Sequence, residues 1–203
     1  LEPDEMRIFK EAGTVSCCFA IETASPRLQK LVHKNLNIDR SINTIRAAVE
    51  QGIYSTGLFM LGFPTETYEE AMMTIELAAK LPLHRAYFML VTPFPGTELA
   101  EMAAETLDRL KGSVDLASMN YLTNTINIST MSDSELKSLF RLSYRHFYMN
   151  PPRIGRLLTR HPHKLSLPYY GMITLVKMFR SETGGWRRRS KSQVCQPCHP
   201  SGG

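Results

Sequence analysis

The chain has 203 residues, and its 24 Lys and Arg against 19 Asp and Glu give a formal net charge of +5. Hydrophobic residues make up 43% and charged residues 21%, a globular composition that excludes a largely disordered or collagen-like protein. Four cysteines are too few for a disulfide scaffold, and no apolar run reaches the ~18 residues of a membrane span. The acidic start of the chain is not a signal peptide, so we expect a cytoplasmic protein.

The charge is unevenly divided along the chain. Residues 1–144 hold 13 basic and 18 acidic residues, whereas residues 145–203 hold 11 basic residues and one acid, Glu182. A change of sign on this scale indicates two regions with different surroundings. We interpret the first as a folded domain and the second as a basic extension suited to an anionic partner, such as a lipid surface or nucleic acid.

The first half of the chain alternates between strand and helix patterns. A helix over 3–13 ends at Gly13, and the apolar run 14–22 predicts a buried strand. Ser25 and Pro26 then begin a short helix as N-cap and first helical residue. The next helix is expected to be capped by Asp39 and to end at Gly52.

The alternation continues with strands over 53–62 and 86–92 and helices over 69–81 and near 98–110. Strands that alternate with amphipathic helices predict parallel pairing with right-handed crossovers. The strands are apolar throughout, as expected when both faces of a sheet are covered. Chemistry in such folds lies at the carboxyl ends of the strands, which here are the loops 22–25, 62–67 and 92–97.

The pattern changes after Gly112. Residues 121–130 alternate and predict a strand or an extended arm, and helices are expected over 132–149, 153–160 and 169–180. We therefore divide the chain into an α/β unit over 1–112, a mainly helical extension over 113–181 and a disordered basic tail over 182–203.

Three strings carry a resemblance to a known family: CCFAIETAS, GIYSTGLFMLGFPTET and AYFMLVTPFPGTEL. In this order and spacing they resemble the second half of a radical SAM barrel, in the group whose members carry an N-terminal cobalamin-binding domain. The later string SYRHFYMNPPRIGRLL is also similar to that group, so the resemblance covers about residues 3–160. It implies a partial TIM-like (β/α) barrel followed by a mainly helical C-terminal extension.

The resemblance also implies a binding site for S-adenosylmethionine (SAM) on the three loops. Glu22 would contact the SAM ribose, with Ser25 retained beside it. The second loop would lie near the methionine and adenine, and the third would pair with the adenine edge. The implied residues of these two loops are Gly62, Phe63, Pro64 and Glu66, followed by Thr92, Pro93, Pro95 and Gly96.

Simpler interpretations of these loops stay open. Glu22 also suits a surface position at a strand end, and Thr65, which stands where the family has glycine, also suits an N-cap of the next helix. The third loop is in any case a rigid turn that Thr97 caps. Thr23 and Ala24 replace a serine and a glycine of the family pattern, which removes a position for close backbone approach.

The cysteines do not match the C-x-x-x-C-x-x-C loop that binds the [4Fe-4S] cluster of this family. Cys17 and Cys18 are adjacent in a strand and point to opposite faces, so we expect packed small side chains and assign no metal ligand. Cys195, Cys198 and His199 have the spacing of a haem attachment or half of a metal site, but an unstructured tail is the favoured interpretation. The cluster loop is expected upstream of Leu1, which makes the chain a fragment.

Two functions follow from these features. The first is a fragment of a radical SAM enzyme that uses SAM, a [4Fe-4S] cluster and cobalamin to modify or methylate a small-molecule or lipid-like substrate. Its partner would be the missing N-terminal half of its own barrel, without which we expect poor solubility or oligomerisation. The alternative is a non-catalytic module, without the cluster, that binds SAM, a partner or a membrane.

The C-terminal region also leaves a choice open. The apolar and aromatic run 169–179 has basic neighbours and predicts either a membrane-interface helix or, as favoured, a helix packed on the barrel. Arg187–Arg189 lie in no recognisable recognition fold, so binding to nucleic acid is not expected.

Overall fold

The computed structural model describes residues 2–109, 126–160 and 167–179. Its sheet has three parallel strands in the order β1 (Ser16–Glu22), β2 (Tyr54–Leu61) and β3 (Arg85–Leu90). This confirms the three predicted strands and their parallel pairing.

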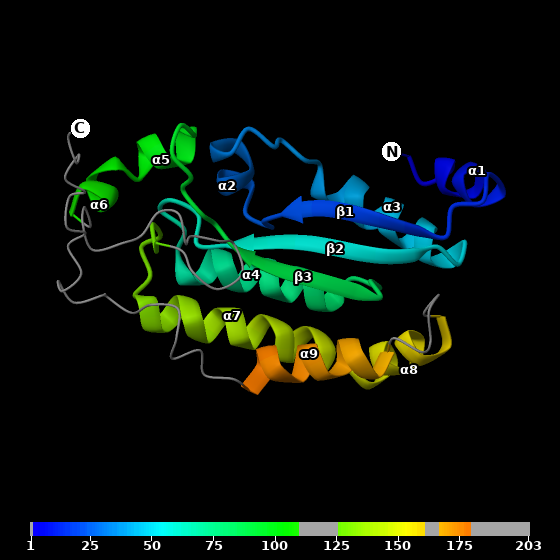
Figure 1. The fold of residues 1–203 in the computed structure, drawn as a ribbon. Coiled ribbons are helices and arrows are strands. Elements are labelled where there is room, and N and C mark those ends of the chain that lie inside the picture. Colours follow the sequence, from blue (N-terminus) through cyan, green and yellow to red (C-terminus); the bar gives the residue numbers. More distant parts are fainter. Residues whose placement is uncertain (1, 110–125, 161–166, 180–203) are drawn as a thin grey trace, which may run out of the picture.

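Helices connect the strands and cover one face of the sheet. In Figure 1, α3 and α4 lie behind the sheet and α7 runs below β3. The helices of this part of the chain are α1 (Glu5–Glu11), α2 (Pro26–Leu31), α3 (Ile38–Glu50), α4 (Tyr68–Lys80), α5 (Glu98–Met102) and α6 (Ala104–Arg109). The single helix predicted near 98–110 is thus divided into two at Ala103.

Helix starts follow capping chemistry, with two differences from the sequence prediction. Ser25 caps α2 and Thr97 caps α5, as predicted. The cap of α3 is Asn37 rather than Asp39, because Asn37 is the extended residue whose side chain accepts the Arg40 N–H. The cap of α4 is Thr67 rather than Thr65, and Thr67 forms a capping box with Glu70.

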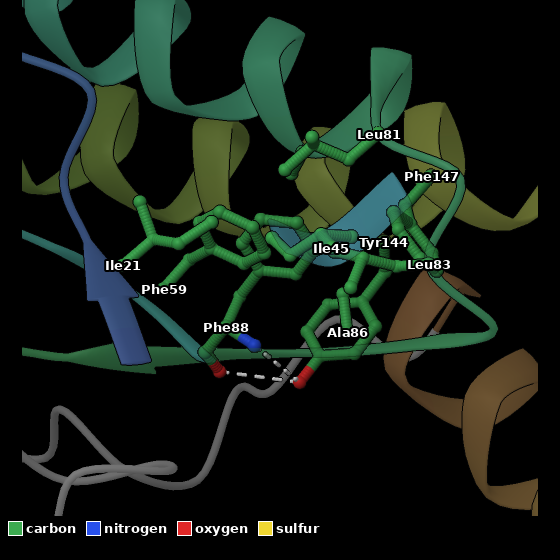
Figure 2. Packing of buried hydrophobic residues seen from close by; sticks show 10 residues of the cluster. Ile21, Ile45, Phe59, Leu81, Leu83, Ala86, Phe88, Tyr144 and Phe147 are labelled. Carbon is green, nitrogen blue, oxygen red and sulfur yellow. Dashed lines mark hydrogen bonds between the residues drawn. The ribbon is translucent and has the colours of Figure 1, made fainter. Parts of the chain in front are cut away.

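The main core lies between the sheet and the helices that cover it (Figure 2). Phe59 of β2 and Phe88 of β3 stack with ring centroids 5.4 Å apart, and Tyr144 and Phe147 of α7 meet Phe88 edge-on. The buried members of this cluster are Ile21, Ile45, Phe59, Ala78, Leu81, Leu83, Ala86, Phe88, Tyr144 and Phe147.

The opposite face of the sheet is less covered than the apolar strands predicted. Cys18 is exposed, whereas Cys17 is half-buried and packs against Met6, Ala48 and Ile53. The expectation of two packed thiols is therefore wrong for Cys18, because it points to the face that no described helix covers. Burial nonetheless raises the pKa of both thiols above the usual value.

The two outer edges of the sheet differ in their hydrogen-bond partners. The Tyr144 hydroxyl lies 3.4 Å from the Phe88 N and 3.2 Å from the Phe88 O, and the Tyr148 hydroxyl bridges the N and O of Ala86 in the same way. Figure 2 shows the Tyr144 contacts. These hydroxyls occupy the outer edge of β3, whereas no described strand pairs with the outer edge of β1. Among the residues that the structure describes, the outer edge of β1 is therefore the one left open for a further strand.

Three further helices follow residue 126: α7 (Asp133–Tyr148), α8 (Pro151–Arg160) and α9 (Leu167–Phe179). Pro151 and Pro152 begin α8 rather than precede it, because a proline in the first turn lacks only an N–H that has no helical partner.

Arg153 of α8 holds the ends of two other helices together. Its side chain is 1% exposed, and its guanidinium donates to the carbonyl oxygens of Phe147, Ala79 and Leu81 at 2.6 to 2.8 Å. The guanidinium also lies 3.5 Å from the centroid of the Phe147 ring. Burial lowers the pKa of Arg153 to about 10.

Several sequence predictions fall outside the described residues. These are most of the strand or arm over 121–130, the tail 182–203, Arg187–Arg189, and the Cys195, Cys198 and His199 group. Residues 126–130 form neither helix nor strand. Within the described ranges, no helix is both long and apolar enough to cross a membrane.

Candidate functional site

The three predicted loops gather at one edge of the sheet, because the parallel strands all end there. The Val91 N–H donates to the Leu61 O at 2.9 Å and so extends the pairing of β2 and β3 past their ends. Leu28, Phe63 and Val91 pack as a buried cluster beneath the loops. One apolar platform thus supports the first, second and third loops together.

Glu22 lies at a distortion that ends β1. The pairing register shifts between Ala20 and Glu22, and Glu22 has a left-handed φ of 67°. The Thr23 N–H donates to the Ile21 O at 2.9 Å across Glu22, which makes a tight three-residue turn. A bulge of this kind re-aims a side chain, and a left-handed non-glycine residue carries backbone strain that is common at functional sites.

The Glu22 carboxylate has one oxygen engaged and one without a partner. Oε1 lies 3.5 Å from the Lys34 Nζ, whereas Oε2 is buried and accepts no hydrogen bond from the described residues. The side chain as a whole is 21% exposed. The carboxylate therefore keeps an unused hydrogen-bond acceptor at the carboxyl end of β1.

The side chain of Gln29 in α2 stabilises the turn at Glu22. Its side chain is 3% exposed, and its Nε2 donates to the Ile21 O and the Thr23 O at 2.7 Å each. These two carbonyls flank Glu22 on either side. The Gln29 Oε1 accepts the Leu36 N–H at 3.4 Å, so the amide also ties the turn to the segment before α3.

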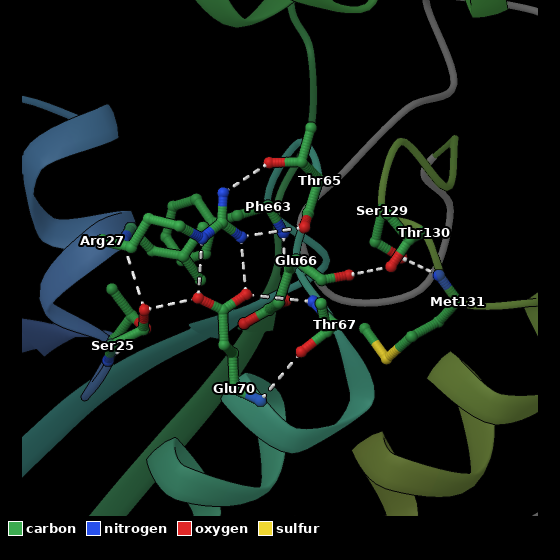
Figure 3. A network of polar contacts seen from close by, with 12 residues as sticks. Ser25, Arg27, Phe63, Thr65, Glu66, Thr67, Glu70, Ser129, Thr130 and Met131 are labelled. Carbon is green, nitrogen blue, oxygen red and sulfur yellow. Dashed lines mark hydrogen bonds and ion pairs between the residues drawn. The ribbon is translucent and has the colours of Figure 1, made fainter.

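Glu66 holds the second loop in shape. It is 0% exposed, and its Oε2 accepts the N–H groups of Gly62 at 2.5 Å and Phe63 at 3.1 Å. Burial raises the pKa of Glu66 to about 7. Its own backbone O accepts two hydrogen bonds from Thr130, as Figure 3 shows. Gly62 has a φ of 89°, which suits glycine at this turn.

A polar network joins the first loop to the second (Figure 3). Arg27 forms a two-pronged ion pair with Glu70, with N···O distances of 2.9 and 2.6 Å. It also donates to the Oγ1 and the O of Thr65 at 2.8 and 2.9 Å. The Ser25 Oγ donates to Glu70 at 2.7 Å. The hydrogen bonds from Arg27 hold the pKa of Glu70 low, at about 2.

Thr65 shows how this chain departs from the glycine of the family pattern. Its φ is 60°, a strained value for a β-branched residue. Arg27 contacts both its side chain and its carbonyl, which offsets the strain. Thr23 is likewise accommodated, because its buried hydroxyl lies 3.2 Å from the Thr74 hydroxyl and accepts the Ser25 N–H.

The third loop is the predicted turn. Its hydrogen bonds run from the Phe94 N to the Thr92 O at 3.0 Å and from the Thr97 N to the Phe94 O at 3.2 Å. Thr92 is 7% exposed, whereas Phe94, Pro95 and Gly96 face solvent. The backbone of this loop is therefore accessible, and its pairing with an adenine edge stays a prediction.

The structure divides the predicted site residues into two groups. Glu22, Pro95 and Gly96 are at least partly accessible. The others are buried and support the loops: Ser25, Gly62, Phe63, Pro64, Glu66, Thr92 and Pro93. Arg27, Gln29 and Glu70 are contributors that the sequence analysis missed. One signal was present, namely a glutamine beside the apolar residues of the helix after Ser25.

The described residues do not fit a [4Fe-4S] cluster. Cys17 and Cys18 point to opposite faces of β1, and no group of three or more His, Cys, Asp or Glu side chains in the described ranges is placed to hold a metal. The chemistry of Glu22 is compatible with a SAM ribose, because its carboxylate has a buried oxygen without a partner at the carboxyl edge of the sheet.

A separate cavity of about 720 Å³ lies at the other end of the sheet, between the last turns of α4 and α7. Lys80, Arg145 and His146 are among its lining residues. It is far along the helices from the loop edge, because α4 begins at that edge and ends at the cavity. It is therefore not part of the candidate SAM site.

Comparison with known proteins finds relatives for the part of the chain that contains the loops at the carboxyl ends of the strands. The radical SAM superfamily model matches residues 1–78, which contain β1, β2 and the first two loops. An uncharacterised methyltransferase of Pyrococcus horikoshii is 32% identical over 155 residues, which cover 76% of this chain and 33% of that protein.

Two further relatives are named for specific activities. A cytidylyl-2-hydroxyethylphosphonate methyltransferase of Streptomyces wedmorensis is 27% identical, covering 66% of this chain and 26% of that protein. An anaerobic magnesium-protoporphyrin IX monomethyl ester cyclase of Cereibacter sphaeroides is 23% identical, covering 71% and 23%. This chain thus spans about a quarter to a third of the length of these relatives. With the loop motifs and the parallel sheet, the matches show that residues 1–78 belong to the radical SAM superfamily.

Proposed function

We propose that this chain forms the carboxyl-terminal half of a radical SAM barrel and supplies the ribose and adenine side of the SAM site. The observation that carries the proposal is the Glu22 carboxylate, held in a strained turn at the carboxyl end of β1 with a buried oxygen that lacks a partner. Strain and an unmet hydrogen bond both cost stability, which favours a role in binding over a purely structural one.

Glu22 would accept hydrogen bonds from the ribose of SAM. A carboxylate is acceptor-only, and the two adjacent hydroxyls of a ribose are donors at matching spacing. Lys34 would engage Oε1 and leave Oε2 for the ligand. Gln29 would fix the direction of the side chain, because it holds both carbonyls that flank Glu22.

The second and third loops would contribute backbone groups and a complementary surface rather than a charged side chain. Glu66 is fully buried and binds the Gly62 and Phe63 amides, so we assign it to positioning the second loop and not to contact with SAM. The exposed backbone of the third loop, at Pro95 and Gly96, would meet the adenine edge. Both assignments extend the resemblance to the family.

The full protein would need a partner segment for its chemistry. In this family, SAM bound at a [4Fe-4S] cluster supplies the radical or methyl group for the reaction. We assign the cluster to residues other than the described ones, since these lack the ligand set. The open edge of β1 supports this arrangement, because further strands of a barrel have room to pair there.

Methyl transfer is the reaction that we favour for the full protein. Two of the three relatives above are named methyltransferases, and one is named a cyclase. Cobalamin belongs to this proposal through the group that the three strings resemble. Cobalamin bound to the natural polypeptide that carries this chain would be detected by its visible absorption, and a polypeptide that binds none would remove this part of the proposal.

Binding of S-adenosylhomocysteine to that natural polypeptide tests the SAM site. We expect Glu22→Gln to weaken binding in isothermal calorimetry about tenfold, the loss of a charge-assisted hydrogen bond. The matched control is Glu98→Gln, which removes an exposed carboxylate 3.4 Å from His33 and should leave the affinity unchanged. Equal affinities for all three proteins would remove the role assigned to Glu22.

A non-catalytic SAM-binding module is the second candidate, favoured by the lack of cluster ligands among the described residues. The reading frame around the codon for Leu1 discriminates the two. An in-frame C-x-x-x-C-x-x-C upstream supports the enzyme, and a genuine start codon near Leu1 supports the module.

A further inference from the structure

Helix α9 exposes an unusual amount of apolar surface. Its sequence LPYYGMITLVKMF has no acidic residue and one lysine. Tyr169, Met172, Leu175 and Val176 are 60%, 59%, 55% and 43% exposed. Their spacing of three and four residues places them on one side of the helix, which defines an apolar stripe.

The other side of α9 is already used. Ile173 and Thr174 are half-buried, and α9 packs on α7. Figure 1 shows α9 below α7, on the side away from the sheet. The helix is therefore apolar around most of its circumference, but α7 covers only one side. A helix apolar all round is normally buried, so the stripe needs a cover that the described residues do not supply.

The charge of the C-terminal region indicates what kind of surface covers the apolar stripe. The region from residue 145 to 203 holds 11 basic residues and one acid. Its described part includes Arg145, which lines the cavity at the end of α7, and Arg156 on α8. An apolar helix face in a strongly basic region matches a membrane interface with anionic headgroups.

A second copy of the chain and the other strands of a barrel are less suitable partners for the apolar stripe. A second copy of the chain would bring two regions of high positive charge together, which repel each other. The upstream strands of a barrel have room beside β1 and not beside β3, where Tyr144 and Tyr148 occupy the edge. Figure 1 places α9 beyond α7, on the far side of β3 from β1. A barrel completed at β1 would therefore leave the stripe uncovered.

We propose that the apolar stripe of α9 docks on the surface of an anionic lipid membrane. The helix has 13 residues, about 20 Å at 1.5 Å per residue, so it would lie in the interface and not cross the bilayer. Tyr169 suits this position, because its ring is apolar and its hydroxyl is polar. The inference concerns a surface remote from the three loops and does not depend on SAM binding.

Vesicle flotation with the natural polypeptide that carries this chain tests the proposal. Flotation separates bound protein from aggregates, which sink. The vesicles are pure phosphatidylcholine, or phosphatidylcholine mixed with phosphatidylglycerol. We expect flotation with the anionic vesicles only, and a loss of bound protein when salt is raised from about 0.1 to about 0.5 M.

The test variant is Met172→Glu with Val176→Glu, which puts two charges on the stripe at exposed positions. We expect it to bind anionic vesicles at least about tenfold more weakly, with an unchanged far-UV circular dichroism spectrum. The control is Met73→Glu on α4, where the side chain is 46% exposed on another surface. It should float like the wild type.

Three results would overturn the proposal. The first is a wild-type protein that does not float with anionic vesicles. The second is equal flotation of the wild type and the double variant. The third is a wild-type dimer that the double variant converts to a monomer without any vesicle binding, which would assign the stripe to a contact between copies of the chain.

Discussion

Gln29 offers a sharp test of the turn that presents Glu22. Replacement of Gln29 by methionine keeps the length and volume of the side chain but removes every hydrogen bond of the amide. The carbonyl of Ile21 would still accept the Thr23 N–H, whereas that of Thr23 would lose the partner that Gln29 supplies. The Leu36 N–H would lose its acceptor as well.

The expected cost follows from burial. Gln29 is 3% exposed, and a buried polar group left unsatisfied costs about 1–3 kcal/mol. We expect Gln29→Met to lower the free energy of unfolding by about 2 kcal/mol, or roughly 30-fold in the equilibrium constant. Urea titration followed by far-UV circular dichroism measures this change, with an unchanged slope as the sign that the folded state is the same.

The matched control is Gln51→Met, at an exposed glutamine that ends α3. We expect it to change the free energy of unfolding by less than about 0.5 kcal/mol. Because Gln29 holds the carbonyls on both sides of Glu22, Gln29→Met should also weaken binding of S-adenosylhomocysteine by the natural polypeptide. A Gln29→Met protein as stable as the control, with full affinity, would refute the bracing role.

Three further variants test the framework around the site. Burial raises the pKa of Glu66 to about 7 from 4.5, so its stabilising contribution is present at low pH and lost as the pH rises through 7. Between pH 4.5 and 7, the free energy of unfolding of the wild type should fall by about 3 kcal/mol relative to that of Glu66→Gln in urea titrations. A difference between the two proteins that does not change with pH would contradict this. Arg153→Met removes the donor to three carbonyls and should cost about 3 kcal/mol by the same assay, whereas a loss below about 1 kcal/mol would show that the guanidinium is dispensable. Tyr144→Phe combined with Tyr148→Phe should cost about 1 kcal/mol for each hydroxyl and increase self-association in analytical ultracentrifugation, and an unchanged sedimentation profile would contradict the role in blocking the β3 edge.

Local patterns predicted the elements well because local chemistry decides them. Ser25 followed by Pro26 predicted the start of α2, and continuous apolar runs between the helices predicted the strands. Where two capping residues stood close together, the sequence could not choose between them. Asn37 rather than Asp39 caps α3 because only its backbone is extended at the helix entrance.

Long-range contacts escaped prediction because they depend on the packed fold. Arg153 reaches Ala79, which is 74 residues away in the chain, and Tyr144 reaches Phe88 across 56 residues. No periodicity encodes such contacts. They explain physically why the string SYRHFYMNPPRIGRLL contains these side chains, since Tyr144, Tyr148 and Arg153 tie α7 and α8 to β3 and α4.

The position of the candidate site was predicted in part. The three loops and Glu22 followed from strand ends and family strings, but the bulge that turns Glu22 depends on backbone geometry at Ala20 and Glu22. Glu66 was expected near SAM because of its place in the string GFPTET. Its carboxylate instead turns inward to the Gly62 and Phe63 amides, a direction that spacing alone does not reveal.

The central claim concerns where SAM binds, and a crystal structure of the natural polypeptide with S-adenosylhomocysteine tests it most directly. The measurement is the distance from the Glu22 carboxylate oxygens to the two ribose hydroxyls. We predict at least one contact within ~3.2 Å, with the adenine beside the Thr92–Gly96 loop. A ligand whose ribose lies beyond hydrogen-bond reach of Glu22 would contradict the account.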